Sequence, residues 1–510
     1  MFVDLGVGDL FEPFSERHWG QERIRLELAM RILRYQNEGI ASGDRVFLLY
    51  GNKLEFFVDL LSIWLLGGCV VPLDPRLTGF EVENLARATN PSFCLVDSET
   101  ESVLHDVVEA CGARILHTES SELKGPSAVD DLPCLKGFAL DSDALILFTS
   151  GSTGSPKGVV HTHRSLRARW ISLGQTLGQA SYRRTLCLLP THFGHGLICN
   201  CLFPWLSGQD LFVAPPFRSD LLTDLGQLID DKRITFLSSV PSIWRIALKL
   251  ASPPSGKSIR RVHCGSAPLS VSLWKEIQRW ASTEEVLNSY GITETGSWVA
   301  GTSMSQFTPE DGLIGEPWGA IIRLSKTADP NHFMSSDALC KTEEQGYVWI
   351  NTPALMTGYL DRPDLTQRVV HNGWFQSGDI GVLDGAGRLY LRGRERDEIN
   401  KGGMKIYPAD IEAIVEGFDQ ARDVCVFGFD DPLYGQDVGM AAVLDDASLA
   451  TLRALHGLLT SRLAAHKYPR RWYLLDEIPR TSRGKVNRDD VRDSCESRNP
   501  VDLRRLLEGS

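Results

Sequence analysis

The sequence predicts an α/β protein with a large N-terminal domain and a small α+β C-terminal domain. Short apolar or β-branched runs alternate with longer amphipathic runs, a pattern typical of α/β folds. The chain has 510 residues, more than one ordinary domain needs, and 43% of them are hydrophobic, so a sizeable core can be buried. The pattern changes past Arg394. We therefore expect a boundary near residues 394–397, which divides the chain into residues 1–395 and 396–510.

The clearest strands of the large domain are short runs of β-branched and apolar residues. They cover residues 45–49, 93–96, 144–149, 185–189 and 234–238. The most apolar stretch, residues 56–73, contains Asp59, two adjacent glycines and Pro72. We therefore expect a buried helix followed by a strand there, and no membrane span.

Between two of these strands, residues 119–143 are polar and show little periodicity, so we expect them to cross the surface. In the small domain, we expect a helix from Pro408, a strand at residues 423–427 and a second helix at residues 448–465. The sequence shows no internal repeat that would indicate a solenoid.

Charge and cysteine content narrow the class of protein. The chain carries 53 Lys and Arg against 65 Asp and Glu, a formal net charge of −12, and has no basic stripe. This disfavours nucleic acid as a partner and predicts that any bound phosphate is held locally. The eleven cysteines are scattered, and the N-terminal residues lack the pattern of a signal peptide. We therefore expect reduced thiols and a cytoplasmic location.

Residues 147–163, LFTSGSTGSPKGVVHTH, form the most informative segment. An apolar strand enters a loop rich in glycine and hydroxyl residues, which ends in Pro156, Lys157 and Gly158. Glycines let backbone amides approach anionic oxygens, hydroxyls add donors, and the lysine supplies a compact positive charge. A Walker A loop has glycine before the lysine and Ser or Thr after it, so this loop is of another kind. A flexible linker would need neither the strand nor the fixed ending. The segment predicts a polyphosphate cradle.

This segment resembles the signature of the adenylate-forming superfamily, which comprises acyl- and aryl-CoA synthetases, adenylation domains and luciferases. Further motifs follow in the family's order: GSAPL at 265–269, SYGITE at 289–294, GEP at 315–317, SGD at 377–379, GR at 393–394 and PRTSRGKV at 479–486. Several spaced motifs in order are far more specific than one glycine-rich loop. The resemblance covers residues 45–488. It implies stacked αβ subdomains in the large domain and a mobile C-terminal lid.

The resemblance also implies catalytic and metal-binding residues. Lys485 would be the adenylation lysine and Thr293 would contact phosphate. Glu294 would help to hold Mg²⁺, with Thr149 as a second metal ligand. These roles make physical sense, because activation of a carboxylate by ATP brings two anions together and develops charge on the α-phosphate.

The nucleotide site implied by the resemblance is built from several motifs. Tyr290 would stack on adenine, and Asp379 would accept both ribose hydroxyls, since a fixed carboxylate matches a paired donor. The residues expected to bind ATP or AMP are Thr149, Ser150, Gly151, Ser152, Thr153, Gly154, Lys157, Gly265, Ser266, Ala267, Pro268, Ser289, Tyr290, Gly291, Asp379 and Arg394.

In the family an acyl-adenylate forms first, and the acyl group then passes to a thiol after the C-terminal domain rotates. The hinge residue of the family, usually Asp or Lys, falls on Arg396 here. A hinge needs only torsional freedom at the end of an element, so arginine is tolerable there. The glycine of the thiol tunnel falls on Gly403, with Gly402 beside it; a plain hairpin turn is the alternative interpretation.

The acyl pocket implied by the same alignment is lined by Phe193, His195, Ser239, His263, Cys264 and Trp298. Amino-acid adenylation domains have an aspartate where Gly194 stands, so an ordinary α-amino acid is disfavoured. The bulk of Trp298 should shorten the cavity. We hypothesise a compact acid, aryl or hydroxylated, with one histidine as hydrogen-bond donor. Either histidine can equally be a satisfied core residue.

The acceptor thiol is expected to arrive on another molecule, because only a short tail follows Lys485. It is coenzyme A or the phosphopantetheine of a separate carrier protein. The sequence therefore predicts an ATP- and Mg²⁺-dependent acid–CoA ligase. The alternatives are a stand-alone enzyme that loads a carrier protein with a non-α-amino acid, and a non-catalytic nucleotide- or acyl-binding relative. Retention of Lys485, Glu294 and Asp379 argues against the last of these.

Overall fold

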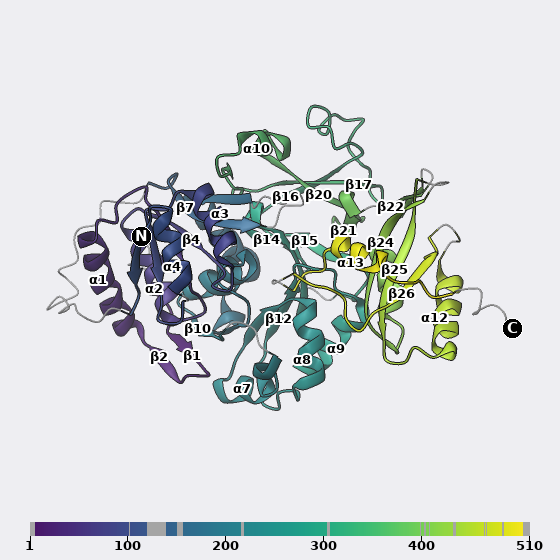
Figure 1. The fold of residues 1–510 in the computed structure, drawn as a ribbon, viewed down its shortest axis with the longest axis horizontal. Coiled ribbons are helices and arrows are strands. Elements are labelled where there is room, and N and C mark those ends of the chain that lie inside the picture. The colour runs from purple at the N-terminus through teal and green to yellow at the C-terminus, as the bar shows by residue number, and fades with distance from the viewer. Residues whose placement is uncertain are drawn as a thin grey trace.

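Two mixed sheets build the N-terminal domain and a smaller sheet builds the C-terminal domain, within the residues that the structure describes. The structure is a computed structural model. It describes residues 6–100, 102–119, 139–149, 157–215, 219–302, 307–397, 399–401, 404–406, 408–431, 435–463, 465, 467–481 and 484–502. Figure 1 shows the large body, coloured purple to green, and the smaller yellow-green body beside α8 and α9. The predicted fold class is confirmed.

The first sheet contains most of the predicted N-terminal strands. Its order is β18 (Gly358–Tyr359), β8 (Lys157–Thr162), β7 (Asp143–Thr149), β4 (Cys69–Pro72), β3 (Arg45–Leu48), β5 (Phe93–Val96) and β6 (Arg114–His117). Its helices are α2 (Leu54–Leu65), α3 (Gly79–Thr89) and α4 (Ser102–Ala110). Every residue of α2 is buried, because its sequence is apolar on all sides, and β4 follows it. The predicted buried helix and strand are therefore confirmed.

The second sheet is larger and holds the other predicted strands. Its order is β16 (Ile321–Ser325), β17 (Gln345–Asn351), β20 (Trp374–Leu383), β21 (Leu389–Arg394), β15 (Leu313–Pro317), β14 (Ser297–Gly301), β13 (Val286–Ile292), β12 (Arg261–Gly265), β11 (Phe236–Ser239), β9 (Arg184–Cys187), β10 (Asp210–Val213), β1 (Leu10–Glu12) and β2 (Arg17–Trp19), with β19 (Val370–His371) beside β20. The helices of this part are α1 (Gln21–Asn37), α5 (His163–Leu177), α6 (Phe203–Trp205), α7 (Leu225–Lys232), α8 (Pro241–Leu250), α9 (Val271–Ala281) and α10 (Pro363–Val369).

Strands β9, β11, β12 and β13 run parallel. Their carboxyl ends therefore meet at one edge of the sheet, where ligands of α/β proteins usually bind. The segments that leave this edge carry Phe193, Ser266 and Thr293, which belong to three of the sequence motifs. The parallel register thus brings together residues that lie about a hundred positions apart.

The C-terminal domain is a sheet with helices on both faces. Its strands are β22 (Ile399–Lys401), β23 (Met404–Ile406), β24 (Ala421–Asp431), β25 (Gly435–Leu444) and β26 (Arg471–Leu474), and its helices are α11 (Pro408–Glu416), α12 (Leu449–Arg462) and α13 (Arg488–Glu496). Successive residues of β24 enter opposite cores, Val426 on one face and Cys425 on the other. The helix from Pro408 and the strand at 423–427 are confirmed, and the second helix ends a turn earlier than predicted.

Several sequence predictions can be compared only with the residues that the structure describes. Residues 120–138, most of the segment expected to cross the surface, lie outside them. The ten cysteines within them are free. None of the described helices is long and apolar enough to span a membrane. The proposed boundary falls at the short helix η6 (Glu395–Asp397), between the two domains, and its exact position stays a prediction.

Candidate active site

The glycine-rich loop connects two paired strands. Strands β7 and β8 are antiparallel, and Thr149 lies directly opposite Lys157. The Thr149 hydroxyl donates to the Lys157 carbonyl over 3.5 Å. The loop therefore leaves and re-enters the sheet at one point, which fixes both of its ends. Of the expected nucleotide-binding residues, Ser150, Gly151, Ser152, Thr153 and Gly154 lie outside the described residues.

Glu294 lies in a buried turn next to this hairpin. The turn is the helix η5 (Thr293–Thr295), which follows β13. Tyr359 of β18 donates its hydroxyl to Glu294 Oε1 over 2.7 Å, and its ring centroid lies 5.5 Å from Lys157 Nζ. On the other side, His161 of β8 shares a hydrogen bond of 2.7 Å between its Nε2 and the Thr293 carbonyl oxygen. The structure thus brings Glu294, Thr293 and Lys157 together.

Asp379 lies at the end of a hairpin and bonds to two other predicted residues. It is opposite Arg394 in the pairing of β20 with β21, and Arg394 Nε lies 2.9 Å from Asp379 Oδ1. The Tyr290 hydroxyl donates to the second carboxylate oxygen. Burial, followed by the charge of Asp379, holds the pKa of Tyr290 well above its usual value, so this hydroxyl stays protonated. The three residues form one polar cluster.

Two glycines of the motifs are required by backbone packing. A Cβ on Gly265 would lie 2.4 Å from the Ser289 carbonyl oxygen, and one on Gly291 would lie 2.1 Å from the Ser297 carbonyl oxygen. Only glycine lets these strands approach so closely. Next to Gly265, Ser266 has a φ of +66°, and Ala267 and Pro268 are exposed. Such a φ is rare outside glycine and is often kept at functional sites.

The C-terminal domain places Lys485 against the N-terminal domain. Lys485 lies in a tight turn, where its carbonyl accepts from the Thr481 amide over 2.8 Å. Its Nζ lies 5.6 Å from the centroid of the Phe193 ring. The side chain is exposed, and Phe193 is 8% exposed at the carboxyl edge of the sheet. The predicted adenylation lysine and the predicted aromatic residue are therefore neighbours, although 292 positions separate them.

His195 begins the π-helix η3 (His195–Leu202), directly after Phe193 and Gly194. π-Helices are rare and often mark functional sites. Ring nitrogen Nδ1 lies 2.9 Å from the Ser266 hydroxyl and Nε2 lies 2.6 Å from the Ser238 hydroxyl. Burial, with a smaller effect of the Lys485 charge, lowers the pKa of His195 to about 3. His195 is therefore a neutral histidine with both nitrogens satisfied.

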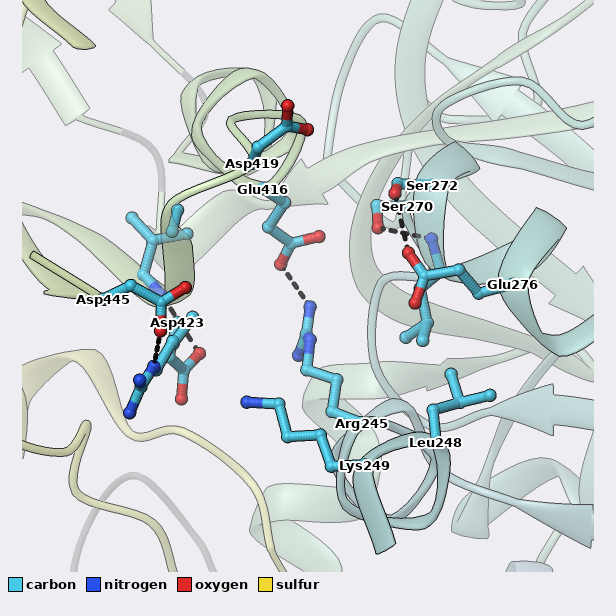
Figure 2. Close-up of a pocket in the computed structure, with 14 residues that line it drawn as sticks. Arg245, Leu248, Lys249, Ser270, Ser272, Glu276, Glu416, Asp419, Asp423 and Asp445 are labelled. Carbon is cyan, nitrogen blue, oxygen red and sulfur yellow. Dashed lines mark hydrogen bonds and ion pairs between the residues drawn. The ribbon is translucent and has the colours of Figure 1, made fainter. Parts of the chain in front are cut away.

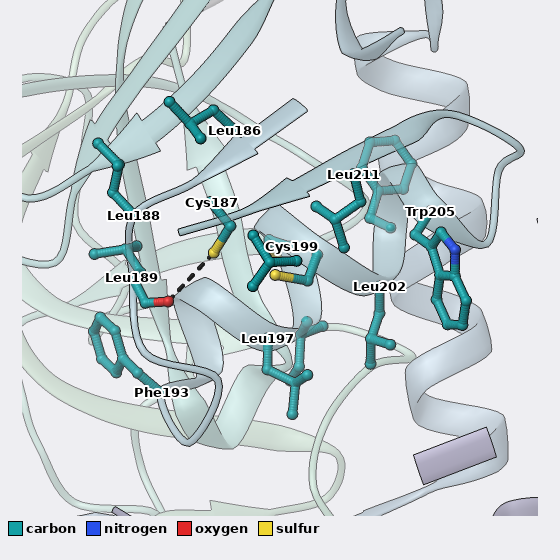
Figure 3. Close-up of a cluster of buried hydrophobic side chains, with 14 of the residues drawn as sticks. Leu186, Cys187, Leu188, Leu189, Phe193, Leu197, Cys199, Leu202, Trp205 and Leu211 are labelled. Carbon is teal, nitrogen blue, oxygen red and sulfur yellow. Dashed lines mark hydrogen bonds between the residues drawn. The ribbon is translucent and has the colours of Figure 1, made fainter. Parts of the chain in front are cut away.

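The π-helix packs on a dense apolar core. Figure 3 shows Phe193 next to Leu189, Cys187 and Cys199 in the middle of the cluster, and Leu197 below them. Cys187 Sγ lies 3.3 Å from the Leu189 carbonyl oxygen, to which it donates. Because this core is closely packed, the edge that carries Phe193 and His195 is rigidly supported.

His263 and Trp298 lie side by side in the interior. Their ring centroids are 4.4 Å apart, and the ring centroid of His195 lies 5.3 Å from that of Trp298. His263 is fully buried, and both of its ring nitrogens lack a hydrogen-bond partner. Burial is the main cause that holds its pKa well below the usual value, so His263 is neutral. Trp298 thus contacts both histidines.

The residues expected to line the acyl pocket lie on two faces of the second sheet. In the pairing of β11 with β12, Ser238 is opposite His263 and Ser239 is opposite Cys264. Because side chains alternate along a strand, Ser239 and Cys264 point to the opposite face from His263 and His195. Ser238 replaces Ser239 beside the histidines.

The first comparison with known proteins is a scan of family models. Residues 27–360 match the model described as AMP-binding enzyme, and residues 410–485 match the AMP-binding enzyme C-terminal domain. The chain belongs to the AMP-binding enzyme family. The predicted adenylate-forming superfamily is therefore confirmed.

Relatives of this AMP-binding enzyme are named as CoA ligases. A feruloyl-CoA synthase from Amycolatopsis is 29% identical over 487 residues, which cover 93% of this chain and 94% of the relative. A long-chain-fatty-acid–CoA ligase from Mycobacterium tuberculosis is 30% identical and covers 89% of each chain. A 2-succinylbenzoate–CoA ligase from Bacillus velezensis is 29% identical, with 91% and 90% covered. These names bear out the predicted class, an AMP-forming acid–thiol ligase.

Solved structures share the fold. ATP-bound MatB from Rhodopseudomonas palustris superposes with a TM-score of 0.83 at 22% identity, over 97% of this chain and 98% of that one. The o-succinylbenzoate CoA synthetase of Bacillus subtilis, with its acyl-adenylate, gives 0.79 at 24% identity, over 98% and 96%. At these identities the likeness establishes only the fold of the AMP-binding enzyme, over both the large and the small domain.

The site of this AMP-binding enzyme includes residues that its motifs do not reveal. Tyr359 contacts Glu294 from 65 positions away, and Ser238 contacts His195 from 43 positions away. His161 lies four residues after Lys157, and only the contact with Thr293 distinguishes it.

Some of the predicted residues lie outside the described part of the chain. These are Gly402 and Gly403, and the side chain of Arg396. Ser289 is buried, with its hydroxyl unpaired.

The described residues fit a Mg²⁺ ion that arrives with ATP. No group of three or more His, Cys, Asp or Glu side chains that could cage a metal occurs in the described part of the chain. Glu294 is a single carboxylate that is 8% exposed. Mg²⁺ at phosphate sites is commonly held by one or two carboxylates together with substrate phosphates. Glu294 suits that role, and Thr149 at the loop entrance offers a hydroxyl.

A cavity of about 500 Å³ lies between the two domains, away from this site. Figure 2 shows Arg245 of α8 reaching across it to Glu416 of α11, with Lys249 below and Asp419 above. Arg245 and Glu416 are 2.5 Å apart. Its lining includes none of the predicted site residues. We assign this cavity to the domain interface, and the ion pair fastens one domain to the other.

Proposed function

We propose that this enzyme activates a compact carboxylic acid with ATP and Mg²⁺ to an acyl-adenylate, releases pyrophosphate, and transfers the acyl group to coenzyme A. The observation that carries the proposal is the position of Lys485. The C-terminal domain delivers this lysine to Phe193 and His195, at the sheet edge where the nucleotide motifs meet.

The proposed adenylation step needs positive charge between two anions. Lys157 stands at the end of the glycine-rich loop, and Lys485 reaches the same sheet edge from the other domain. The two ammonium groups would offset charge on the phosphates and on the attacking carboxylate. When bound, Mg²⁺ would supply further positive charge at the phosphates, held by Glu294. Asp379 would accept from the ribose, with Arg394 and Tyr290 fixing its orientation.

The shape of the acyl site supports a compact acid. Trp298 is 2% exposed and packs against both His195 and His263, so the indole fills space beside the reacting edge. His195 is already bonded to Ser238 and Ser266. His263 retains two unpaired nitrogens. We therefore infer that neither histidine is open to an acid in this structure, because His195 is bonded to two serines and His263 is fully buried against Trp298.

An ordinary α-amino acid does not suit this site. A Cβ on Gly194 would lie 3.7 Å from Thr293 Oγ1, so this position faces the reacting region. With glycine there, no carboxylate is provided for an α-ammonium group, and a desolvated cation without a partner is costly. The names of the relatives span feruloyl, 2-succinylbenzoate and long-chain fatty acyl groups, so they do not decide between acids.

An ATP–pyrophosphate exchange screen over aryl, short aliphatic, β-amino and long-chain acids tests the proposal. We expect the highest exchange with a compact aryl or short acid. A long-chain acid with the highest rate would overturn the inference about size. The same acid is then offered with coenzyme A and with a holo-carrier protein. Thioester formed only on the carrier would favour the stand-alone adenylation enzyme.

The role of Lys485 is tested by Lys485→Ala. We expect exchange to fall by about two powers of ten or more, because the lysine acts on developing charge. Lys341→Ala, at an exposed lysine of the N-terminal domain, is the matched control and should keep wild-type exchange. Equal rates in both variants would remove Lys485 from the mechanism. Nucleotide binding without exchange for any acid would favour the non-catalytic relative.

A further inference from the structure

Tyr359 is a rigid residue that none of the motifs contains. It lies in β18, opposite Val159 of β8. Its amide donates to the Thr366 hydroxyl over 2.8 Å, and the ring packs in a small core with Val159, Met356 and Phe375. The side chain is 8% exposed. Tyr359 is therefore held from its backbone to its ring before any ligand arrives.

Tyr359 contacts two residues of the proposed ATP site at once. Its hydroxyl lies 2.7 Å from Glu294 Oε1, and its ring lies beneath Lys157 Nζ, 5.5 Å from the centroid. The side chain of Tyr359 thus connects Lys157, at the end of the glycine-rich loop, to the carboxylate of Glu294 in η5. The same segment also holds the backbone of Glu294, because the Met356 amide donates to the Glu294 carbonyl over 2.8 Å.

The hydrogen bond has a defined direction. The phenolic hydroxyl of Tyr359 is aimed at Glu294 Oε1, 2.7 Å away. An ionised carboxylate only accepts, so Tyr359 donates and Glu294 accepts. This bond uses one lone-pair position of Oε1. The remaining positions of the carboxylate stay available to a cation.

The contact with Lys157 differs from an ion pair in its effect on charge. Among the described residues, the side-chain contact of Lys157 Nζ is with the face of the Tyr359 ring, 5.5 Å from its centroid. An aromatic face attracts an ammonium group without neutralising it. The ring can therefore orient the lysine while its full positive charge remains available to phosphate oxygens.

We propose that Tyr359 is a positioning residue that holds the Glu294 carboxylate and the Lys157 ammonium in the orientation that binds the Mg²⁺-bound triphosphate of ATP. This inference rests on the proposed function only in that ATP is the nucleotide. Its two contacts act separately. The hydroxyl orients Glu294 for the Mg²⁺ ion, and the ring orients Lys157 for the phosphate groups.

Two substitutions separate the contacts. Tyr359→Phe removes the hydroxyl and keeps the ring, whereas Tyr359→Leu removes both. Calorimetric titration of ATP into the full chain, without acid or thiol, measures the dissociation constant in Mg²⁺ and in EDTA. For Tyr359→Phe we expect about tenfold weaker binding in Mg²⁺ and no change in EDTA. For Tyr359→Leu we expect weaker binding in both, because Lys157 is no longer oriented.

The matched control is Tyr390→Phe. Tyr390 of β21 also donates its hydroxyl to a glutamate, Glu310, over 3.2 Å, but this hydrogen bond is exposed. The ATP affinity of Tyr390→Phe should equal that of the wild type in Mg²⁺ and in EDTA. Unchanged affinity of Tyr359→Phe in Mg²⁺, or equal weakening in Mg²⁺ and EDTA, would overturn the proposal about Tyr359 alone. A wild-type chain that binds no ATP would overturn the proposed function as well.

Discussion

Acid should destabilise this protein, because histidines of the site, His161 and His195 among them, are buried in their neutral form. His161 is fully buried between Thr293 and Ser165, and burial lowers its pKa to about 4. The pKa of His195 is lowered to about 3, first by burial and then by the charge of Lys485. We therefore expect the free energy of unfolding to decrease when the pH falls from 7 to 5.

The magnitude follows from proton linkage. An unfolded histidine titrates near 6.5, above both folded values, so the unfolded state binds more protons as the pH falls. Stability is therefore fully present above pH 6.5 and is lost as the pH falls toward the folded values. pH 5 lies about 1.5 units below the pKa of an unfolded histidine. Protonation therefore stabilises the unfolded state by roughly 2 kcal/mol per histidine. His161 and His195 together should cost about 4 kcal/mol, a large part of a typical folding free energy.

Urea unfolding at several pH values between 5 and 7.5 measures this loss. His161→Gln keeps an N–H donor for the Thr293 carbonyl but cannot titrate. We expect this variant to lose about 2 kcal/mol less than the wild type between pH 7 and 5. His18→Gln, at an exposed histidine, is the control and should follow the wild-type profile. Parallel profiles for the wild type and His161→Gln would refute the reasoning about His161.

Three further substitutions test other parts of the structure. Asp59→Asn removes the buried carboxylate that accepts from Arg31 over 2.5 Å; the free energy of unfolding should fall by about 3–5 kcal/mol, and an unchanged urea midpoint would contradict this. Arg245→Ala breaks the interdomain pair with Glu416; single-turnover adenylation should slow severalfold while thioester formation from supplied acyl-adenylate does not, and equal slowing of both would argue against an interface role. Trp298→Val should raise kcat/KM for larger acids about tenfold relative to the best compact acid; an unchanged preference would show that the indole does not limit the site.

The sequence was sufficient for the order of elements and for the family. Strands such as β3, β5 and β7 appear where short apolar runs predicted them, because a strand buried on both faces needs a continuous apolar run. The motifs at Glu294, Asp379 and Lys485 were recognisable because each is a local run of residues.

The acyl pocket was less predictable, because its lining depends on which way side chains point. The alignment selected Ser239 and Cys264, but the register of β11 with β12 turns both away from His263. A shift of one position along a strand exchanges its two faces. Nothing in the local sequence marks Ser238 as the residue that bonds to His195.

By itself, the sequence determined the fold class, the two domains and the chemistry of the motifs, since local patterns and spacing carry that information. The tertiary structure alone decided which residues share the site. It placed Lys485 beside Phe193, gave His195 two serine partners and left His263 with none. It also placed Tyr359 between Glu294 and Lys157. The physical reason is that such contacts depend on sheet register and on the seating of one domain against the other, which join residues far apart in the chain.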